Sequence, residues 1–393
     1  MGVSSPHQTL PRLTKILTLS LYAILPLVLL FYLLSPSPIA APPSTSTSPP
    51  HGERQQVVKT ATGAPPGTQG SKPAPQCDYS EGEWIPNAAG PRYTGTSCGA
   101  TIKHEQNCIV NGRPDTGYLN WRWRPRGCAL PPFAPAEFLE LVRGRHVAFV
   151  GDSLARNQCE SLVCLLGSEY PVELVLDGGE ERKFRRWAFR SHNATVSVFW
   201  SPFLVKGTEK SWAPGGLGYK YNRLYLDQPD ERWAAELPGI DVVVLSFGQW
   251  FLQSAMYYER GAVIGCHHCP EPNRTETGFF GVFRLAVKNA LRDVIARSSA
   301  GREKLAVLTT FSPAHFDGEW DSPGACARTE PYAPGEKEMS YFHPFPFAGA
   351  GGEKKRERVP NDCVHSCLPG PIDTWNEILL QMVKRWRGAS SSR

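Results

Sequence analysis

Short apolar runs alternate with longer segments of helical spacing in this chain, and this alternation constrains its fold most. Three continuous runs have the length of buried strands, namely residues 146–150, 241–247 and 304–311. Three segments place apolar residues at helical spacing, namely residues 154–166, 279–298 and 372–386. Strands that are apolar throughout and alternate with helices are typical of a parallel sheet with both faces covered. The sequence therefore predicts an α/β fold with helices on both sides of a parallel central sheet.

Glycine and polar residues directly follow two of these strands. Gly151, Asp152 and Ser153 come after the first run, and Gly248 comes after the second. In open α/β sheets, ligands bind beyond the carboxyl ends of the strands. We therefore expect a functional site at this edge. His315 follows the third run, where it either lines the site or is a hydrogen-bonded structural histidine.

Ser153 stands where a strand is expected to pass into a helix. A serine at such a turn has an exposed Oγ, and the N–H groups of the first helical turn point toward a developing oxyanion. Serine also needs a neighbouring base before it becomes a nucleophile. The alternative is a helix N-cap, a role that both Asp152 and Ser153 perform well. The tripeptide alone favours the cap, so the base decides between the two.

Asp362 and His365 supply the residue types that a serine nucleophile requires. Three residues apart, they can meet in one turn, where the carboxylate orients the imidazole and the other ring nitrogen takes the serine proton. The alternative is an ordinary surface turn. Cys363 and Cys367 argue against it, because disulfides there would fix the turn rigidly. The Gly-x-Ser-x-Gly motif is absent, which disfavours a hydrolase of the nucleophile-elbow type.

The N-terminus determines the expected compartment. Residues 16–34 are apolar and uncharged, about long enough to span a bilayer. Arg12 and Lys15 precede the run, and the next cation is Arg54. The positive-inside rule thus predicts a cytosolic tail over residues 1–15, a signal anchor, and a luminal body. A cleaved signal peptide is the alternative, and it also delivers the body to the secretory lumen, where disulfides persist.

Three further regions follow the apolar run. Residues 35–76 are rich in Pro, Ser and Thr without an apolar period, which predicts a disordered stalk. Residues 77–135 are rich in Cys and Trp, which predicts a loop-rich segment tied by disulfides, and residues 136–393 form the expected catalytic domain. Asn193 and Asn273 begin glycosylation sequons that suit a luminal protein.

Charge and residue types exclude or weaken several other functions. The net charge of +5 over 393 residues, without a dominant basic stripe, argues against a dedicated nucleic-acid binder. Cys266-His267-His268-Cys269 has the residue types of a zinc site. A disulfide or separate half-cystines in a luminal loop are the favoured alternatives, so no metal is expected. No phosphate-binding loop is evident, and no bound cofactor is expected.

Several motifs occur together in one order over about residues 77–386, and together they are far more specific than any one alone. They are Cys77-Asp78 with Gly82-x-Trp84, Gly112-Arg113-Pro114-Asp115, Trp121-Arg122-Trp123, Gly151-Asp152-Ser153, and Asp362-x-x-His365 with Cys367-Leu368-Pro369-Gly370. In these motifs the chain resembles the plant trichome-birefringence-like family of wall polysaccharide O-acetyltransferases. The stretch from Gly265 to Cys269, with Asn273-x-Thr275 and residues 311–316, looks most like the xyloglucan O-acetyltransferase branch.

The resemblance implies an SGNH-like three-layer α/β/α fold in a single-pass type II protein of the Golgi membrane. It implies a Ser153–His365–Asp362 triad that takes an acetyl group and passes it to a hydroxyl of the polysaccharide. The expected partners are xyloglucan and an acetyl donor, either acetyl-CoA or another acetyl compound. Residues expected to line the oxyanion site or the substrate are Gly151, Asp152, Arg156, Gly248 and Gln249.

The resemblance also implies four disulfides. The expected pairs are Cys77–Cys128, Cys98–Cys164, Cys108–Cys367 and Cys326–Cys363. Cys159, Cys266 and Cys269 remain, and the last two are placed to pair with each other.

Two departures from the family leave other functions open. Gln249 stands where the family usually has histidine, so a proton-transfer role is lost there. Between about residues 338 and 342 the family usually carries several dozen more residues, including a strand. The alternatives to xyloglucan O-acetylation are a polysaccharide acetylesterase, an acetyltransferase for xylan or mannan, and a catalytically inactive glycan-binding relative.

Overall fold

The protein is described by a computed structural model, in which the chain divides into two compact units, Met1–Lys72 and Pro73–Arg393. The residues that the structure describes all belong to the second unit; they are 77–178, 182–211, 220–269, 271, 273–298, 303–309, 311, 312, 316, 324–333, 336 and 363–391. The predicted cytosolic tail, signal anchor and stalk over residues 1–76 lie outside them. Within these ranges, no helix combines the length and apolar character needed to cross a bilayer.

A six-stranded sheet forms the centre of the unit, in the order β12-β9-β3-β6-β5-β4. Its strands are β3 (His146–Gly151), β4 (Glu173–Gly178), β5 (Phe184–Phe189), β6 (Ala194–Trp200), β9 (Val242–Ser246) and β12 (Leu305–Leu308). β12, β9, β3 and β6 run parallel to one another, whereas β5 and β4 are antiparallel to their neighbours. The predicted parallel sheet is therefore confirmed for the strands of the three apolar runs and for β6, whereas the antiparallel β5 and β4 were not predicted. Short links join β4, β5 and β6, and a parallel pair needs a crossover of about a dozen residues or more.

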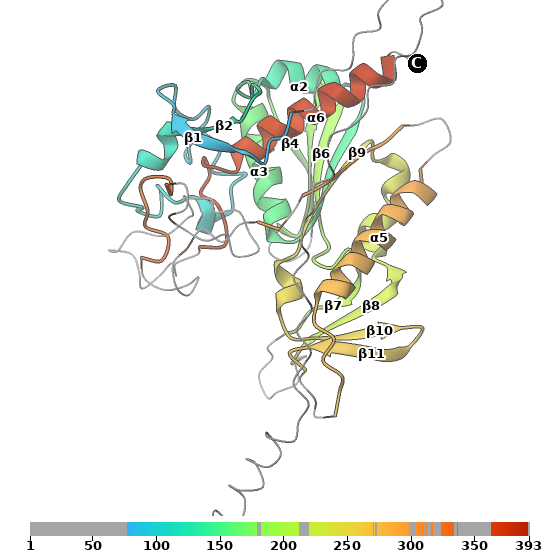
Figure 1. Cartoon of the computed structure of the whole chain (residues 1–393). Coiled ribbons are helices and arrows are strands. Elements are labelled where there is room, and N and C mark those ends of the chain that lie inside the picture. Colours follow the sequence, from blue (N-terminus) through green and yellow to red (C-terminus); the bar gives the residue numbers. More distant parts are fainter. Residues whose placement is uncertain are drawn as a thin grey trace, which may run out of the picture. The chain divides into compact units, whose positions relative to one another are not determined.

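Helices cover both faces of this sheet and complete three layers (Figure 1). The structure contains α2 (Pro135–Leu141), α3 (Ser153–Gly167), α4 (Glu231–Ala234), α5 (Phe280–Ala296) and α6 (Asp373–Ser391). One core packs α2, α3 and α6 against Val147 and Phe149 of β3, and the other packs α4 and α5 against Ala148 and Val150. Successive residues of a strand point to opposite faces, so β3 and β9 contribute to both cores and must be apolar throughout. The three predicted helices are confirmed within a few residues.

A second sheet lies beyond the central one and was not predicted. It has four strands in the order β11-β10-β8-β7, namely β7 (Val205–Thr208), β8 (Asn222–Pro229), β10 (Ala255–Glu259) and β11 (Ala262–His267). In β8, buried Leu224 and Leu226 alternate with half-buried or exposed neighbours. These leucines belong to the same core as residues of α5, so one face of the small sheet is buried. Figure 1 shows β8 and the small sheet next to α5.

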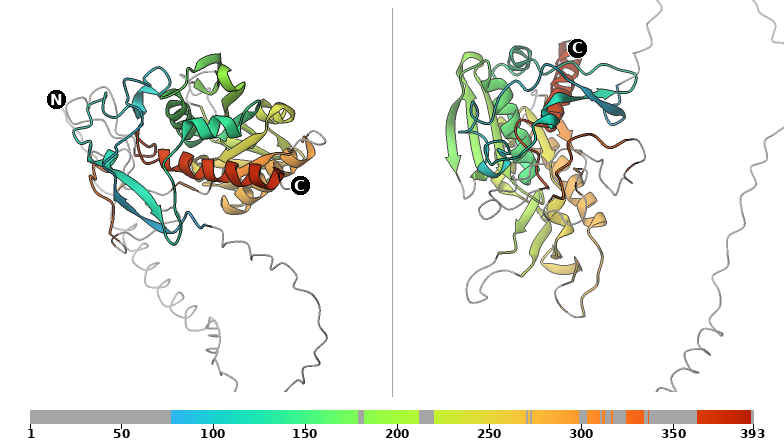
Figure 2. Two further views of the ribbon diagram at one scale, coloured as in Figure 1. Left: turned by 90° about the horizontal axis from the view of Figure 1, so that it is seen from above. Right: turned by 90° about the vertical axis from the view of Figure 1, so that its left-hand side faces the viewer.

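The segment that precedes α2 contains little regular structure, as predicted. A two-stranded antiparallel sheet pairs β1 (Gly82–Pro86) with β2 (Trp121–Pro125), and short 3₁₀ helices occur at η1 (His104–Gln106) and η2 (Gly117–Asn120). Further 3₁₀ helices in the chain are η4 (Arg190–His192), η6 (Leu237–Gly239) and η7 (Gln249–Leu252). The segment lies against α3 and α6 through the Cys98–Cys164 disulfide and a hydrogen bond from Tyr93 to Asp373 (Figure 2).

Candidate active site

Ser153 is the first residue of α3 and follows the carboxyl end of β3 by two residues. Gly151 makes the turn between them at a φ of +154°, and a Cβ there would lie 1.7 Å from the carbonyl oxygen of Ser246. Only glycine fits so close an approach of two strands. Asp152 is the N-cap, since its side chain accepts a hydrogen bond from the N–H of Leu154. The capping role therefore belongs to Asp152, and Ser153 is left at the first helical position.

The Asp152 carboxyl joins the ends of β3 and β9. It is fully buried; Oδ1 accepts from the N–H of Leu154 at 3.0 Å, and Oδ2 accepts from the N–H of Gly248 at 3.1 Å. Burial raises the pKa of Asp152 to about 6, against the opposing effects of these hydrogen bonds and of His365. Asp152 thus supports the site from within instead of facing a substrate.

Gly248 was expected to line the oxyanion site or the substrate, but it too contacts Asp152 instead. Its N–H donates to the Asp152 carboxyl, so in this structure it is not directed at an oxyanion. Gly248 has a φ of +145°, and a Cβ there would lie 2.7 Å from the ring of Phe311. The glycine therefore allows the chain after β9 to turn against that ring.

Aromatic side chains stand at the ends of β6 and β9. Trp200 and Trp250 meet edge to face with ring centroids 5.6 Å apart, and the guanidinium of Arg156 lies 5.8 Å from the Trp200 ring. Arg156 is buried on the first turn of α3, and Gln249 begins η7 in a half-buried position. Sequence reasoning missed both tryptophans. The sequence feature that could have identified them is an aromatic residue within a few positions of the carboxyl end of a strand.

His365 lies on a loop that is fastened to the first turns of α3. The amide of Asn157 forms two hydrogen bonds with the backbone of Ser366, each of 3.1 Å. His365 is close enough to Asp152 to act on its pKa. The structure therefore brings His365 to the end of β3 that carries Ser153. Asp362 and His315 lie outside the described residues.

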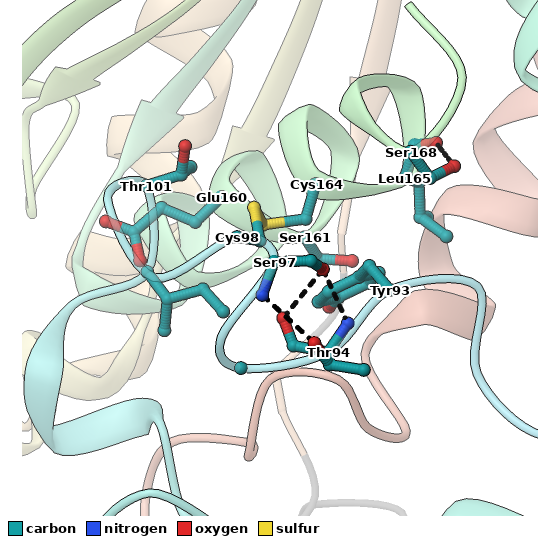
Figure 3. Close-up of a disulfide and its surroundings, with 12 residues drawn as sticks. Tyr93, Thr94, Ser97, Cys98, Thr101, Glu160, Ser161, Cys164, Leu165 and Ser168 are labelled. Atoms are coloured by element: carbon teal, nitrogen blue, oxygen red, sulfur yellow. Dashed lines mark hydrogen bonds between the residues drawn. A yellow bond between two sulfur atoms is a disulfide. The ribbon is translucent and has the colours of Figure 1, made fainter.

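The four disulfides that the resemblance implied are present. They are Cys77–Cys128, Cys98–Cys164, Cys108–Cys367 and Cys326–Cys363. Figure 3 shows Cys98–Cys164, which ties the turn containing Thr94 and Ser97 to α3. Two of the bonds fix the residues on either side of His365, as expected.

The remaining cysteines do not support a zinc site. Cys266 and Cys269 form a disulfide, so neither is a thiolate ligand. Across the described ranges, no three potential metal-binding side chains gather. Cys159 is a buried thiol whose pKa is raised by burial. The two sequon asparagines, Asn193 and Asn273, are exposed and adopt positive φ angles.

Two family models match almost the whole of the described unit. The PMR5 N-terminal domain matches residues 75–129. The GDSL/SGNH-like acyl-esterase family found in Pmr5 and Cas1p matches residues 130–344 and 341–382. The second model thus matches in two pieces that meet at residues 341–344, next to the place where the resemblance implies missing residues.

Similar proteins cover most of the chain. Xyloglucan O-acetyltransferase 2 of Populus trichocarpa is 49% identical over 80% of this chain and 83% of its own length. Xyloglucan O-acetyltransferase 1 of Arabidopsis thaliana is 43% identical over 98% of this chain and its own full length. That alignment spans 431 positions, more than the 393 residues present here, so the relative carries additional residues. Protein trichome birefringence-like 20 of Arabidopsis thaliana is 38% identical over 79% of this chain and 72% of its own length. The chain therefore belongs to the GDSL/SGNH-like acyl-esterase family found in Pmr5 and Cas1p, and within it to the trichome-birefringence-like proteins.

Proposed function

We propose that this protein is an O-acetyltransferase that transfers acetyl groups to hydroxyls of xyloglucan. The observation that carries the proposal is the placement of Ser153 at the first position of α3, with the His365 loop hydrogen-bonded to the same helix. The relatives with 43% and 49% identity, whose names state this activity, support the choice of acceptor.

In the proposed reaction, Ser153 Oγ attacks the carbonyl carbon of the acetyl donor while His365 removes the hydroxyl proton. The donor's leaving group departs with that proton, and the acetyl group remains as an ester on Ser153. A sugar hydroxyl then attacks the ester, again with His365 as base, and the proton returns to Ser153. Asp362 orients the imidazole, and the helix N-terminus stabilises the oxyanion of each tetrahedral intermediate.

We further propose a single-pass type II arrangement in the Golgi membrane, with the body in the lumen. The uncharged run over residues 16–34, preceded by Arg12 and Lys15, supports this orientation. Five disulfides and the exposed sequon asparagines Asn193 and Asn273 suit an oxidising lumen.

The test uses the full-length chain in membranes, with xyloglucan oligosaccharide and acetyl-labelled donor. Acetyl-CoA and a nitrophenyl acetate ester serve as two donor probes. Wild type should yield labelled oligosaccharide, and Ser153→Ala should yield none. Ser168→Ala, at the exposed end of the same helix, is the matched control and should keep full transfer. Absence of transfer from both donors by folded wild type would refute the proposal. Label released as acetate would indicate an acetylesterase, and label on xylan or mannan alone would change the acceptor.

A second candidate is a glycan-binding relative without catalytic activity. Two observations favour it: Gln249 cannot transfer a proton, and the alignment with a relative exceeds the length of this chain. Xyloglucan binding without turnover, unchanged by Ser153→Ala, would support this candidate over the enzyme.

A further inference from the structure

A fully buried asparagine connects the proposed base to the helix that carries the proposed nucleophile. Asn157 lies one turn after Ser153 on α3 and has no exposed surface. Its Nδ2 donates to the carbonyl oxygen of Ser366 at 3.1 Å, and its Oδ1 accepts from the N–H of Ser366 at 3.1 Å. One amide therefore holds both backbone groups of the residue that follows His365.

The N-terminal segment completes this arrangement. The Asn157 Nδ2 also donates to Oε1 of Gln106 at 3.1 Å, and the carbonyl oxygen of Gln106 accepts from the N–H of Leu368 at 2.9 Å. Gln106 is itself buried, at 2% exposure. The disulfide between Cys108 and Cys367 lies beside these contacts. Three consecutive residues after His365 are thus each tied to α3 or to the N-terminal segment.

We propose that Asn157 is a positioning residue for the base of the acyl-transfer reaction, and that Gln106 holds Asn157 in place. This inference rests on the proposed function of Ser153 and His365. Residues four apart on a helix lie on the same face, so α3 carries both Ser153 and the anchor of the His365 loop. The separation of the serine oxygen and the imidazole is then set by one rigid element and two hydrogen bonds. A misplacement of about 1 Å in such a pair can cost roughly a hundredfold in rate.

A purely structural asparagine would also lower stability when removed, so the test needs a matched control. Asn376 on α6 provides it, because it is equally buried and its Nδ2 donates to the Gln158 carbonyl oxygen at 3.1 Å and to Ser161 Oγ at 2.8 Å. These bonds join α6 to α3 and do not involve the His365 loop. Asn376→Ala therefore removes similar bonds without releasing the base.

The experiment measures two rates on the full-length chain. One is acetyl transfer to xyloglucan oligosaccharide, and the other is covalent labelling of Ser153 by a fluorophosphonate, which needs the serine and its base but no sugar. For Asn157→Ala, we expect kcat and the labelling rate to fall at least about tenfold, with KM changed less than about twofold. Asn376→Ala should keep wild-type rates per folded molecule, and Gln106→Ala should show a smaller fall than Asn157→Ala.

The pH profile of labelling distinguishes a displaced His365 from a general loss of structure in the variant. In wild type, labelling should rise with pH, because acid suppresses base-assisted attack by Ser153. In Asn157→Ala, this rise should flatten, because a displaced imidazole no longer assists Ser153. Asn157→Asp retains an oxygen for the Ser366 N–H but loses the donor to its carbonyl oxygen. If Asn157→Ala does not fold, Asn157→Asp still tests the proposal, and its labelling rate should also fall.

The outcomes distinguish this inference from the proposed function. Wild-type labelling of Ser153 without acetyl transfer would refute the proposed reaction, while the labelling rates would still test Asn157. Labelling of folded Asn157→Ala and Asn157→Asp at the wild-type rate, with the wild-type pH profile, would overturn the inference alone. An equal loss of labelling in Asn376→Ala would also overturn it. No labelling of folded wild type would overturn both.

Discussion

Replacing Asp373 by asparagine should remove one contribution to the pH dependence of this protein's stability. Asp373 begins α6, and its carboxyl is enclosed between the N-terminal segment and α3. Oδ1 accepts from the hydroxyls of Tyr93 at 2.9 Å and Ser161 at 2.5 Å, and Oδ2 accepts from the N–H of Gly370 at 3.3 Å. Burial outweighs these hydrogen bonds and raises the pKa of Asp373 from 3.8 to about 6.

The sign of the effect follows from this rise in pKa. Because the folded protein holds the proton more tightly than the unfolded chain, the contribution of Asp373 to stability is fully present below the unfolded pKa of 3.8. It is lost as the pH rises through the folded pKa of about 6. One pKa unit corresponds to about 1.4 kcal/mol, so the loss is at most about 3 kcal/mol, and less where solvent reaches this half-buried residue.

Asparagine suits this position because both hydroxyl partners can reverse their hydrogen bonds. The new amide nitrogen can donate to Tyr93 and Ser161, while the amide oxygen still accepts from Gly370. Urea unfolding of the full chain with its disulfides intact, followed by tryptophan fluorescence at about pH 4 and about pH 8, measures the effect. The wild type should lose more stability than Asp373→Asn as the pH rises. Asp227→Asn, which changes an exposed carboxylate, should behave as wild type. An unchanged pH dependence in Asp373→Asn would refute the reasoning.

Three further changes test other parts of the fold. The Cys108–Cys367 disulfide joins residues 259 positions apart, so its removal should lower the free energy of unfolding by about 5–6 kcal/mol by the chain-entropy relation. It should also lower activity, because Cys367 lies next to the His365 loop. The Cys266–Cys269 disulfide has a sequence separation of 3, so its removal should lower the free energy of unfolding by under about 2 kcal/mol. Chemical unfolding of the two double-alanine variants checks which disulfide contributes more stability. Gly151→Ala should cost at least about 3 kcal/mol, because its Cβ would meet a backbone oxygen at 1.7 Å; wild-type thermal stability would contradict this.

The sequence predicted the parts of the fold that are buried on two faces. β3 and β9 contribute to both cores, which requires unbroken apolar runs, and these runs were found within one or two residues. The small sheet was missed because its strands are buried on one face only, as the alternation in β8 shows. The antiparallel β4 and β5 were missed for a related reason, since β4 is largely exposed at the sheet edge and its apolar run is only three residues long.

The candidate site was predictable where a motif marks the chemistry. Ser153 and His365 belong to short patterns with a mechanism behind them, and Asp362 of the same pattern lies outside the described residues and stays a prediction. Asn157 and Gln106 carry no such pattern, because a buried amide is recognised only by the partners that the fold supplies. The contact of Gly248 with Asp152 was beyond sequence reasoning for the same reason, since the two residues are 96 positions apart.

The resemblance implies that several dozen residues, including a strand, are missing between about residues 338 and 342, and the described sheet edge shows which contacts such a strand could affect. In the described part of the chain, β12 is the edge strand on that side, and Leu308 within it is 44% exposed. A further strand paired with β12 would extend the sheet there, on the far side of β9 from β3. The supports of Ser153 and His365 come from other elements: the Asp152 carboxyl holds Gly248, and Asn157 holds the base loop. Because none of these contacts uses β12, the supports of the proposed nucleophile and base do not depend on a further strand at that edge. This independence favours an enzyme over an inactive relative. Fluorophosphonate labelling of Ser153 needs no acceptor, so it tests the nucleophile and base more directly than acetyl transfer to xyloglucan does.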